Sequence, residues 1–381
     1  MDFELNEEQR LVRDMVHDLA QNEIAPRAAQ VDKTEEFPAE NIRKLAELDL
    51  MGLPYPEAYG GGGGDYLSYA IAVEEIARAC GSTALVYAAH ISLGCGPIYS
   101  FGTEDQKQKW LPLLCSGQGL GAFGLTEPEA GSDAGATRTT AVRDGDYYVL
   151  NGSKMWITSG AIAEVVNCTA KTDSEAGTRG ITCFLVEKGM PGFIPGKNEP
   201  KMGLKGSVTS ALSLEDCRVP AANLLGEEGE GFKQMLITLD GGRISIGAMA
   251  LGLAQAALDE AIRYARERVQ FGQPIAKFQA IQWMLADMAT EIDAARLMVY
   301  RAAALKDAGK RFTKEAAMAK LYASEVAERA AFKALQIHGG YGYSREYPVE
   351  RIYRDQRLCS IGEGTSEIQR LVIARQVLGK I

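Results

Sequence analysis

The chain has 381 residues, of which 46% are hydrophobic and 24% are charged, and its formal net charge at pH 7 is −9. This length and balance are typical of a globular protein with one large core or two to three smaller ones. The acidic charge argues against nucleic acid as a partner, because binding to the phosphate backbone needs clustered basic side chains.

The cysteines and histidines indicate a reduced protein without a metal site. Seven cysteines are scattered along the chain without a C-x-x-C pair, and the three histidines are far apart. We therefore expect free thiols and no metal cluster. The N-terminus "MDFELNEEQR" is acidic and no apolar run is expected to span a bilayer, so the sequence predicts a cytoplasmic protein with no membrane insertion.

Residues 1–118 have the pattern of helices. Asn6 and Gln9 are the expected capping pair of a first helix, and Pro38 is expected to open a second. The run "YGGGGGDY" at 59–66 lacks both the preceding strand and the Lys-Ser/Thr ending of a phosphate-binding loop. We interpret it as a flexible connector.

Between residues 119 and 228 the pattern becomes that of strands. The stretch "VRDGDYYVLNGSKMWITSG" has Asp-Gly and Asn-Gly pairs beside Tyr, Val, Trp and Ile, which predicts hairpin turns at both pairs. The segments "EVVNCTAKT", "GITCFLVEKG" and "TSALSLEDCRV" continue the series. A compact β unit is therefore expected here.

The remainder of the chain has the pattern of long helices. The segments 229–268, 278–308 and 313–338 keep an apolar periodicity and contain no proline. Helices, a β unit and then helices again predict an α+β fold with segregated elements. We expect three domains, at 1–118, 119–228 and 229–381.

The stretch "SIGEGTSEIQR" at 360–370 places Glu363 between two glycines, immediately before a helical run. One reading is helix chemistry: Thr365 or Ser366 caps the helix, an acidic group complements its dipole, and Ile368, Leu371 and Val372 are buried. The other reading is a functional carboxylate that the glycines admit into a narrow space. The stretch alone leaves both open.

Four further stretches could contribute to a site. "AFGLTEPEAGSD" (122–133) offers hydroxyls and backbone N–H groups among small residues, although it could be only a loop between domains. Trp156 in "KMWITSG" could be a core residue or an aromatic wall beside the Thr158 hydroxyl. Arg243 in "LDGGRISIG" and Arg268 in "RERVQFG" could bind anions, although most such arginines lie on the surface.

The motifs "LTEPEAGSD", "MWITSG", "ERVQFG", "LQIHGGYGY" and "IGEGTSEIQRLVIAR", in this order and over essentially the whole chain, closely resemble the acyl-CoA dehydrogenase family. The resemblance implies an N-terminal helical domain, a central small β-barrel or β-sandwich domain and a C-terminal four-helix bundle. It also implies FAD as cofactor, an acyl-CoA substrate, an electron-transfer flavoprotein as partner, and a homotetramer built as a dimer of dimers. The expected reaction is α,β-dehydrogenation of a saturated acyl-CoA to the trans-2-enoyl-CoA, as in fatty acid β-oxidation.

By the same resemblance, residues from five parts of the chain would bind FAD, partly across a dimer interface, with Thr158 near the flavin N5. These residues are Phe123, Leu125, Thr126, Ser132, Trp156, Ile157, Thr158, Arg268, Phe271, Gln279, Gln336, Ile337, His338, Gly339, Gly340, Thr365, Ser366 and Glu367. The substrate would be contacted by Ser132, Asp240, Arg243 and Gly364.

The resemblance also gives Glu363 a role, because the general base of the family sits at this position. Some members carry the base at the position of Gly242 instead, and a glycine there cannot act. The Glu363 backbone N–H would bind the thioester oxygen and stabilise enolate-like charge. His338 is interpreted as a packed histidine near the cofactor, and Gly362 stands where many members have tyrosine.

Two alternatives to this function remain. The first is the same chemistry on a branched or alicyclic acyl-CoA, since the acyl pocket around 82–99 has no shape that the sequence reveals. A dicarboxylyl substrate is not expected, because Ala84 stands in the segment where members for such substrates carry an arginine. The second is an acyl-CoA-binding protein without turnover.

Overall fold

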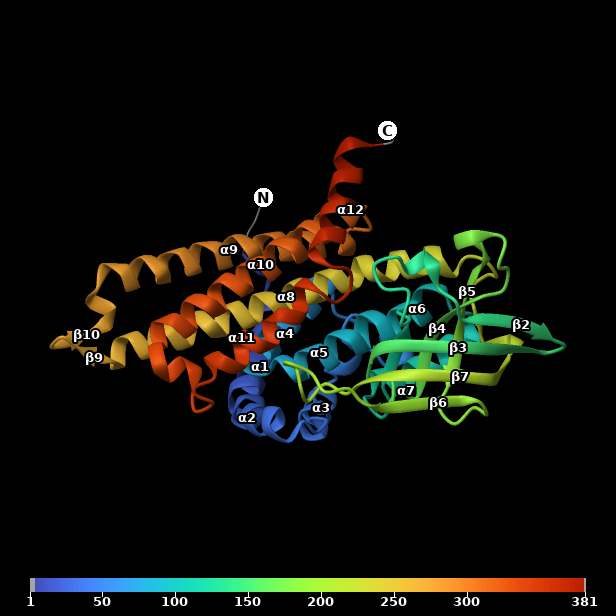
Figure 1. The fold of residues 1–381 in the computed structure, drawn as a ribbon, viewed down its shortest axis with the longest axis horizontal. Coiled ribbons are helices and arrows are strands. Elements are labelled where there is room, and N and C mark those ends of the chain that lie inside the picture. The colour runs from blue at the N-terminus through green and yellow to red at the C-terminus, as the bar shows by residue number, and fades with distance from the viewer. Residues whose placement is uncertain (1–3, 380–381) are drawn as a thin grey trace.

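The computed structural model describes residues 4–379, and its helices and strands are segregated along the chain as expected. Figure 1 shows an elongated molecule with a β-sheet at one end and the tip of a long helical bundle at the other. The N-terminal helices lie between and below these parts. The predicted α+β class is confirmed.

The N-terminal part is helical. Its helices are α1 (Glu7–Leu19), α2 (Ala25–Thr34), α3 (Ala39–Glu47), α4 (Tyr66–Ala79), α5 (Gly81–Ala89), α6 (Gly96–Phe101) and α7 (Glu104–Cys115). The predicted capping box at Asn6 and Gln9 is present, Pro38 is the residue before α3, and the glycine run is a loop before α4. The helix start at Asn6 was therefore predicted correctly, whereas α2, which has Pro26 in its first turn, was missed, so Pro38 precedes the third helix and not the second.

Two helical stretches of the described chain correct the expectation about apolar runs. Gly81–Phe101 and Gly231–Glu267 are each long and apolar enough to cross a membrane by length and composition. In both, however, 78% of the apolar window is buried inside the protein, which is the property of core helices.

The strands form one mixed sheet. They are β1 (Gly121–Gly124), β2 (Thr140–Asp144), β3 (Tyr147–Thr158), β4 (Val165–Lys171), β5 (Ile181–Glu187), β6 (Phe193–Asn198), β7 (Thr209–Pro220) and β8 (Leu224–Leu225). The order is β6-β7-β3-β2-β4-β5-β8, and β1 pairs in parallel with β4. The sheet encloses a small core of its own, separate from the large core of the helices.

One of the two predicted hairpin turns is wrong. The turn at Asp144–Gly145 joins β2 to β3 as expected, but Asn151 and Gly152 lie inside β3. At Gly152 the register between β3 and β7 shifts, and φ is +150°. A Cβ at this position would lie 2.5 Å from the Thr139 hydroxyl oxygen, so the glycine permits a close strand contact and not a turn.

The C-terminal part is built on three long helices, α8 (Gly231–Glu267), α9 (Gln279–Asp307) and α10 (Thr313–His338). They run side by side in Figure 1, and α8 also packs on α4, which joins the bundle to the N-terminal helices. The strands β9 (Val269–Gln270) and β10 (Gln273–Pro274) form a hairpin at the tip. The helices α11 (Val349–Asp355) and α12 (Ser366–Leu378) follow, and α12 packs on α10 with its far end projecting outward.

The predicted burial of α12 is wrong in part. Leu371 is 51% exposed, whereas the polar Ser366 and Gln369 are the buried residues of this helix. The residues that α12 buries are therefore polar, whereas the apolar Ile368 and Val372 are half-buried and Leu371 is exposed.

Candidate active site

Glu363 does not serve the dipole of α12. Thr365 is the N-cap and accepts a hydrogen bond from the Ile368 N–H at 3.3 Å, and the acidic residue of the first turn is Glu367. Glu363 lies before the cap, in a turn where its own φ is +54° and that of Gly364 is +92°. This backbone directs the carboxylate inward, so the interpretation of Glu363 as a helix-start carboxylate is wrong.

The carboxylate of Glu363 is seated against Gly242 of α8. A Cβ added to Gly242 would lie 1.9 Å from Glu363 Oε2 and 3.3 Å from Leu93 Cδ2. The carboxylate therefore occupies space that only a glycine at 242 leaves free. Glu363 and Gly242, the two positions at which members of the resembled family carry the base, are thus in contact in this structure.

The Glu363 carboxylate has an unusual electrostatic environment. Its Oε2 atom is buried and has no hydrogen-bond partner among the described residues. Burial raises the pKa of Glu363 to about 7, against the opposing influence of the Lys320 and Arg243 charges. A carboxyl group with this pKa can accept a proton near neutral pH.

Asp240 and Arg243 form a network beside Glu363. The Arg243 Nη1 donates to Asp240 Oδ1 at 2.5 Å, and the Thr313 hydroxyl donates to Asp240 Oδ2 at 2.6 Å. Burial raises the pKa of Asp240, which Thr313 and Arg243 oppose. Because both of its carboxylate oxygens are occupied, Asp240 is a poorer proton acceptor than Glu363.

The sheet presents Trp156 to the outside. Trp156 is 55% exposed and has φ of +61°, at a register shift between β3 and β7. Ile157 is buried beneath it and Thr158 is half-buried. The Met155 N–H donates to the Thr126 carbonyl at 2.8 Å, which ties the bulge to the segment of Phe123, Leu125 and Thr126. Trp156 is thus a surface aromatic and not a core residue.

A buried ion pair lies between these two segments. Lys154 is fully buried, and its Nζ donates to Glu127 Oε1 at 2.7 Å and to the Thr169 hydroxyl at 3.1 Å. Glu127 also accepts from the Thr139 N–H at 3.2 Å and the Arg138 N–H at 2.5 Å. Although burial acts in the opposite direction, Lys154 and the hydrogen bonds lower the pKa of Glu127 to about 2.

We expect Lys154→Met to lower the free energy of unfolding by about 3–5 kcal/mol, because it leaves the Glu127 charge buried without a partner. The double variant Lys154→Met/Glu127→Gln should lose less than the sum of the single losses. Urea unfolding followed by circular dichroism measures both. Lys188→Met is the matched control: it removes the exposed pair with Glu164 and should cost less than about 1 kcal/mol. Equal losses in Lys154→Met and Lys188→Met would contradict the prediction.

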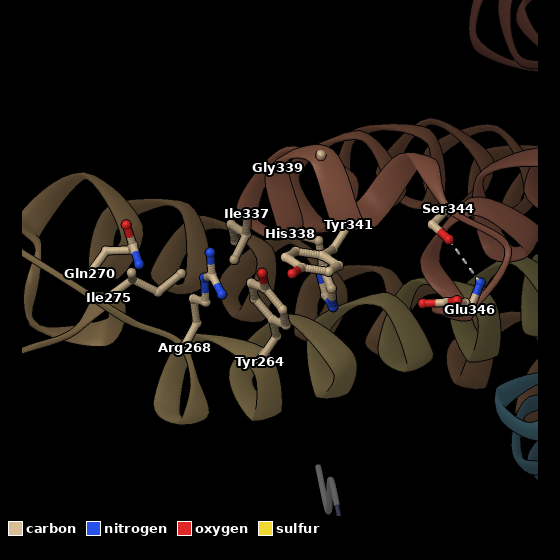
Figure 2. A pocket seen from close by; sticks show the side chains of 11 residues that line it. Tyr264, Arg268, Gln270, Ile275, Ile337, His338, Gly339, Tyr341, Ser344 and Glu346 are labelled. Carbon is tan, nitrogen blue, oxygen red and sulfur yellow. Dashed lines mark hydrogen bonds between the residues drawn. The ribbon is translucent and has the colours of Figure 1, made fainter.

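A second group of predicted residues lines a pocket of about 610 Å³ at the tip of the bundle. Figure 2 shows Tyr264 and Arg268 rising from α8 towards Ile337, His338 and Tyr341 at the end of α10. His338 stacks on Tyr264 with ring centroids 4.2 Å apart, and its Nδ1–H donates to the Ala334 carbonyl at 2.8 Å. His338 is therefore a packed residue, as expected, and burial lowers its pKa.

The predicted site residues fall into two separate groups. The pocket collects Arg268, Ile337, His338, Gly339 and Gly340, while Phe271, Gln279 and Gln336 are exposed nearby on the same end. The sheet residues lie at the other end of the molecule (Figure 1). Gly242 and Arg268 are both on or next to α8, so the 1.5 Å rise per residue separates Glu363 from the pocket by about 40 Å.

Three residues close to the site were missed in the sequence. Lys320 Nζ and Gln369 Nε2 both donate to the Gly364 carbonyl, at 2.6 and 2.8 Å, and Lys154 anchors the segment before Trp156. The sequence pattern could have indicated that Lys320 is buried, because Lys320 lies at helical spacing with three alanines that are buried: Ala316, Ala323 and Ala327. A lysine in an apolar stripe predicts a buried charge with a partner.

Comparison with known proteins identifies the family of the chain. Family profiles match three consecutive parts of the chain: the acyl-CoA dehydrogenase N-terminal domain at 6–118, the middle domain at 122–217 and the C-terminal domain at 229–378. A probable acyl-CoA dehydrogenase of Bacillus subtilis is 60% identical over 99% of this chain and 100% of its own.

Solved structures give the same result. The butyryl-CoA dehydrogenase of Megasphaera elsdenii has a TM-score of 0.97 at 48% identity, covering 99% of this chain and 100% of its own. A chain from the structure of the electron transferring flavoprotein of Acidaminococcus fermentans has a TM-score of 0.98 at 50% identity, with both chains covered completely. This chain therefore belongs to the acyl-CoA dehydrogenase family of FAD-dependent oxidoreductases.

Proposed function

We propose that the protein catalyses the α,β-dehydrogenation of a short-chain saturated acyl-CoA, with Glu363 as the base. The observation that carries this proposal is the buried Glu363 carboxylate, which has an unpaired oxygen and a pKa of about 7. A carboxylate without a partner is costly to bury, so its retention fits a group kept free for a proton.

In the proposed mechanism Glu363 takes the proton from C2 of the acyl group. The C2–H bond breaks, the proton passes to a carboxylate oxygen, and the electron pair becomes the new C2–C3 double bond as hydride leaves C3. FAD, when bound, supplies the acceptor for that hydride. The Glu363 N–H donates to the thioester oxygen and stabilises the enolate-like charge, and Asp240, Arg243, Ser132 and Gly364 line the substrate path.

The residues on both sides of the proposed FAD site fit a flavin dinucleotide. Trp156 is an exposed aromatic next to Thr158, which suits a planar ring. In the described part of the chain, the buried Ser366 hydroxyl at the start of α12 has no hydrogen-bond partner, and free N–H groups at a helix start favour anions. At the other end, the pocket of Arg268 offers a cation and aromatic rings, and the Arg268 guanidinium lies 5.2 Å from the Tyr341 ring centroid.

Because Gly242, which contacts Glu363, and Arg268 are about 40 Å apart along α8, farther than one extended dinucleotide reaches, we propose that two subunits share each FAD. Outward-facing apolar side chains on the bundle support a dimer of dimers: Phe271 (92% exposed), Trp283, Phe332, Leu371, Val377 and Leu378. We expect sedimentation velocity of the FAD-loaded protein to give a tetramer. A monomer with one tightly bound FAD would contradict a shared site.

The short-chain preference is supported by two tyrosines near Glu363. The charge of Glu363 acts on Tyr66 and Tyr69, whose ring centroids are 5.0 Å apart, and Tyr69 is fully buried. We propose that these two rings limit the length of the acyl chain that fits beside Glu363. The related butyryl-CoA dehydrogenase points in the same direction.

A panel of acyl-CoA thioesters tests the function. The protein is mixed anaerobically with butyryl-, hexanoyl-, octanoyl-, isobutyryl- and cyclohexanecarbonyl-CoA, and bleaching of the flavin absorption is recorded. We expect the fastest bleaching with butyryl- or hexanoyl-CoA. Faster bleaching by a branched or cyclic thioester would favour the alternative substrates, and a colourless protein that binds acyl-CoA would favour the non-catalytic alternative.

We further propose an electron-transfer flavoprotein as the electron acceptor and the cytoplasm as the location. The first is supported by family membership, and the second by seven cysteines that are all free and buried. Reoxidation of the bleached protein by purified electron-transfer flavoprotein tests the electron acceptor. Fractionation of cells tests the location.

A further inference from the structure

Lys320 is a fully buried lysine in the middle of α10, and nothing in the reaction described above uses it. It lies on the face of α10 that carries buried alanines. Burying an ammonium group is costly unless hydrogen bonds and an opposite charge offset the loss of water. The contacts of Lys320 therefore indicate what retains it.

Those contacts lead to the turn that carries Glu363. The Lys320 Nζ donates to the Gly364 carbonyl at 2.6 Å. Gln369 Nε2, from α12, donates to the same carbonyl at 2.8 Å and to the Glu363 carbonyl at 3.3 Å. Two side chains from two helices thus hold a turn whose residues both have positive φ, a conformation that a non-glycine residue adopts only when its surroundings enforce it.

The charge of Lys320 also acts on the Glu363 carboxylate. The groups facing Glu363 come from three elements: Lys320 on α10, Arg243 on α8, and the phenols of Tyr66 and Tyr69 on α4. Lys320 in turn faces the Cys359 thiol and Glu367. Arg243 is already paired with Asp240, whereas Lys320 donates to the neutral Gly364 carbonyl and, among the described residues, forms no ion pair with an acid.

We propose that Lys320 is a positioning residue that holds the 363–364 turn and, through its charge, keeps Glu363 ionised and ready to accept a proton. This inference rests on the proposed role of Glu363 as the base. Lys320 would act in two ways. It donates a hydrogen bond to the Gly364 carbonyl, as Gln369 also does, and it carries a positive charge, which Gln369 lacks.

The state of Lys320 is compatible with this role. Burial lowers its pKa to about 8, so it remains protonated through the neutral range in which Glu363 titrates. Without the positive charge of Lys320, less would oppose the effect of burial on Glu363, and the pKa of Glu363 would rise. The base would then be protonated, and inactive, up to a higher pH.

The test is the pH dependence of kcat/KM for butyryl-CoA, measured with the FAD-loaded protein. At low pH kcat/KM falls as Glu363 becomes protonated, and we call this part of the profile the acid limb. We expect the acid limb to move to higher pH by about one pH unit in Lys320→Met, because an opposite charge nearby lowers a carboxyl pKa by that order. The rate of this variant should recover as the pH rises. Lys320→Arg keeps the charge and should return the acid limb towards that of the wild type. Gln369→Leu removes the other donor to Gly364 without a change of charge, and should lower the rate while leaving the acid limb in place.

Each outcome separates the alternatives. An unmoved acid limb in a folded Lys320→Met would overturn the proposal and leave Lys320 a structural residue. If Lys320→Met does not fold, Lys320→Gln, which keeps an amide donor but no charge, is measured in its place with the same expectation. A variant Glu363→Gln with normal turnover would instead remove the proposed base itself, which is a different failure.

Discussion

We expect Glu363→Gln to fold and to bind FAD and acyl-CoA, while the rate of flavin bleaching falls by about two or more orders of magnitude, the scale of a positioned general base. Glutamine has nearly the shape of glutamate and fits the space beside Gly242. It cannot accept the C2 proton. Binding should be retained because the substitution leaves unchanged the backbone of the turn, which we propose contacts the thioester.

Anaerobic stopped-flow mixing with butyryl-CoA measures this loss, and acyl-CoA binding is followed separately by the perturbation of the flavin spectrum. Glu328→Gln is the matched control, since it removes the same charge from a half-exposed position on α10 near Arg357. It should bleach at close to the wild-type rate. Similar bleaching in Glu363→Gln would mean that the base lies elsewhere. Asp240 would be the carboxylate to examine next, although Arg243 and Thr313 occupy both of its oxygens.

Sequence patterns predicted the parts of the fold that depend on local interactions. The Asn6–Gln9 capping box, the start of α3 at Pro38 and the three long helices depend on contacts within a few residues or on a repeated period, and both are visible in one sequence. The turn predicted at the Asn-Gly pair was wrong because the role of Gly152 depends on contacts that are distant in the sequence. Gly152 is required by the close approach of Thr139, which depends on how strands pair and not on the local sequence.

Burial was harder to predict for apolar side chains that the single chain leaves exposed. The apolar positions of α12 were expected in the core, yet Leu371 is exposed in the single chain. Apolar periodicity predicts a face that is covered, but it does not identify what covers it. Trp156 is a similar case, because a tryptophan in a β unit is usually a core residue and here a bulge turns it outward.

The candidate site was predictable as a set of motifs but not as a geometry. The glycines around Glu363 suggested an unusual backbone, and the positive φ at Glu363 and Gly364 agrees. The contact between Glu363 and Gly242, by contrast, joins residues 121 positions apart, since 363 minus 242 is 121. No local pattern reveals such a contact, and it is the contact from which the sharpest structural prediction comes.

We expect Gly242→Ala to reduce turnover by about 100-fold without weakening the fold. The added methyl group would lie 1.9 Å from Glu363 Oε2, so the carboxylate must retreat by roughly 1 Å or more to reach an ordinary contact. A displacement of that size at a reacting group can cost about 100-fold in rate. Alanine is a better helix former than glycine by about 0.5–1 kcal/mol, and α8 is helical at this position, so the folded state should tolerate the change.

Three further variants make the result specific to the clash. Gly247→Ala lies on the same helix, and the atoms nearest its added methyl group would be Val299 Cγ2 at 3.2 Å and backbone atoms of Ala319 and Lys320 at 3.5 Å or more, so it should keep near-normal turnover. Glu363→Asp shortens the base by one methylene, which costs activity in the wild type but relieves the contact with the new methyl group. The double variant Gly242→Ala/Glu363→Asp should therefore lose less than the product of the two single losses. Stopped-flow bleaching and thermal unfolding of the four proteins measure rate and stability separately. Normal turnover in Gly242→Ala would show that the carboxylate works from another position, whereas a purely multiplicative double variant would show that the two residues do not share the space that the structure gives them.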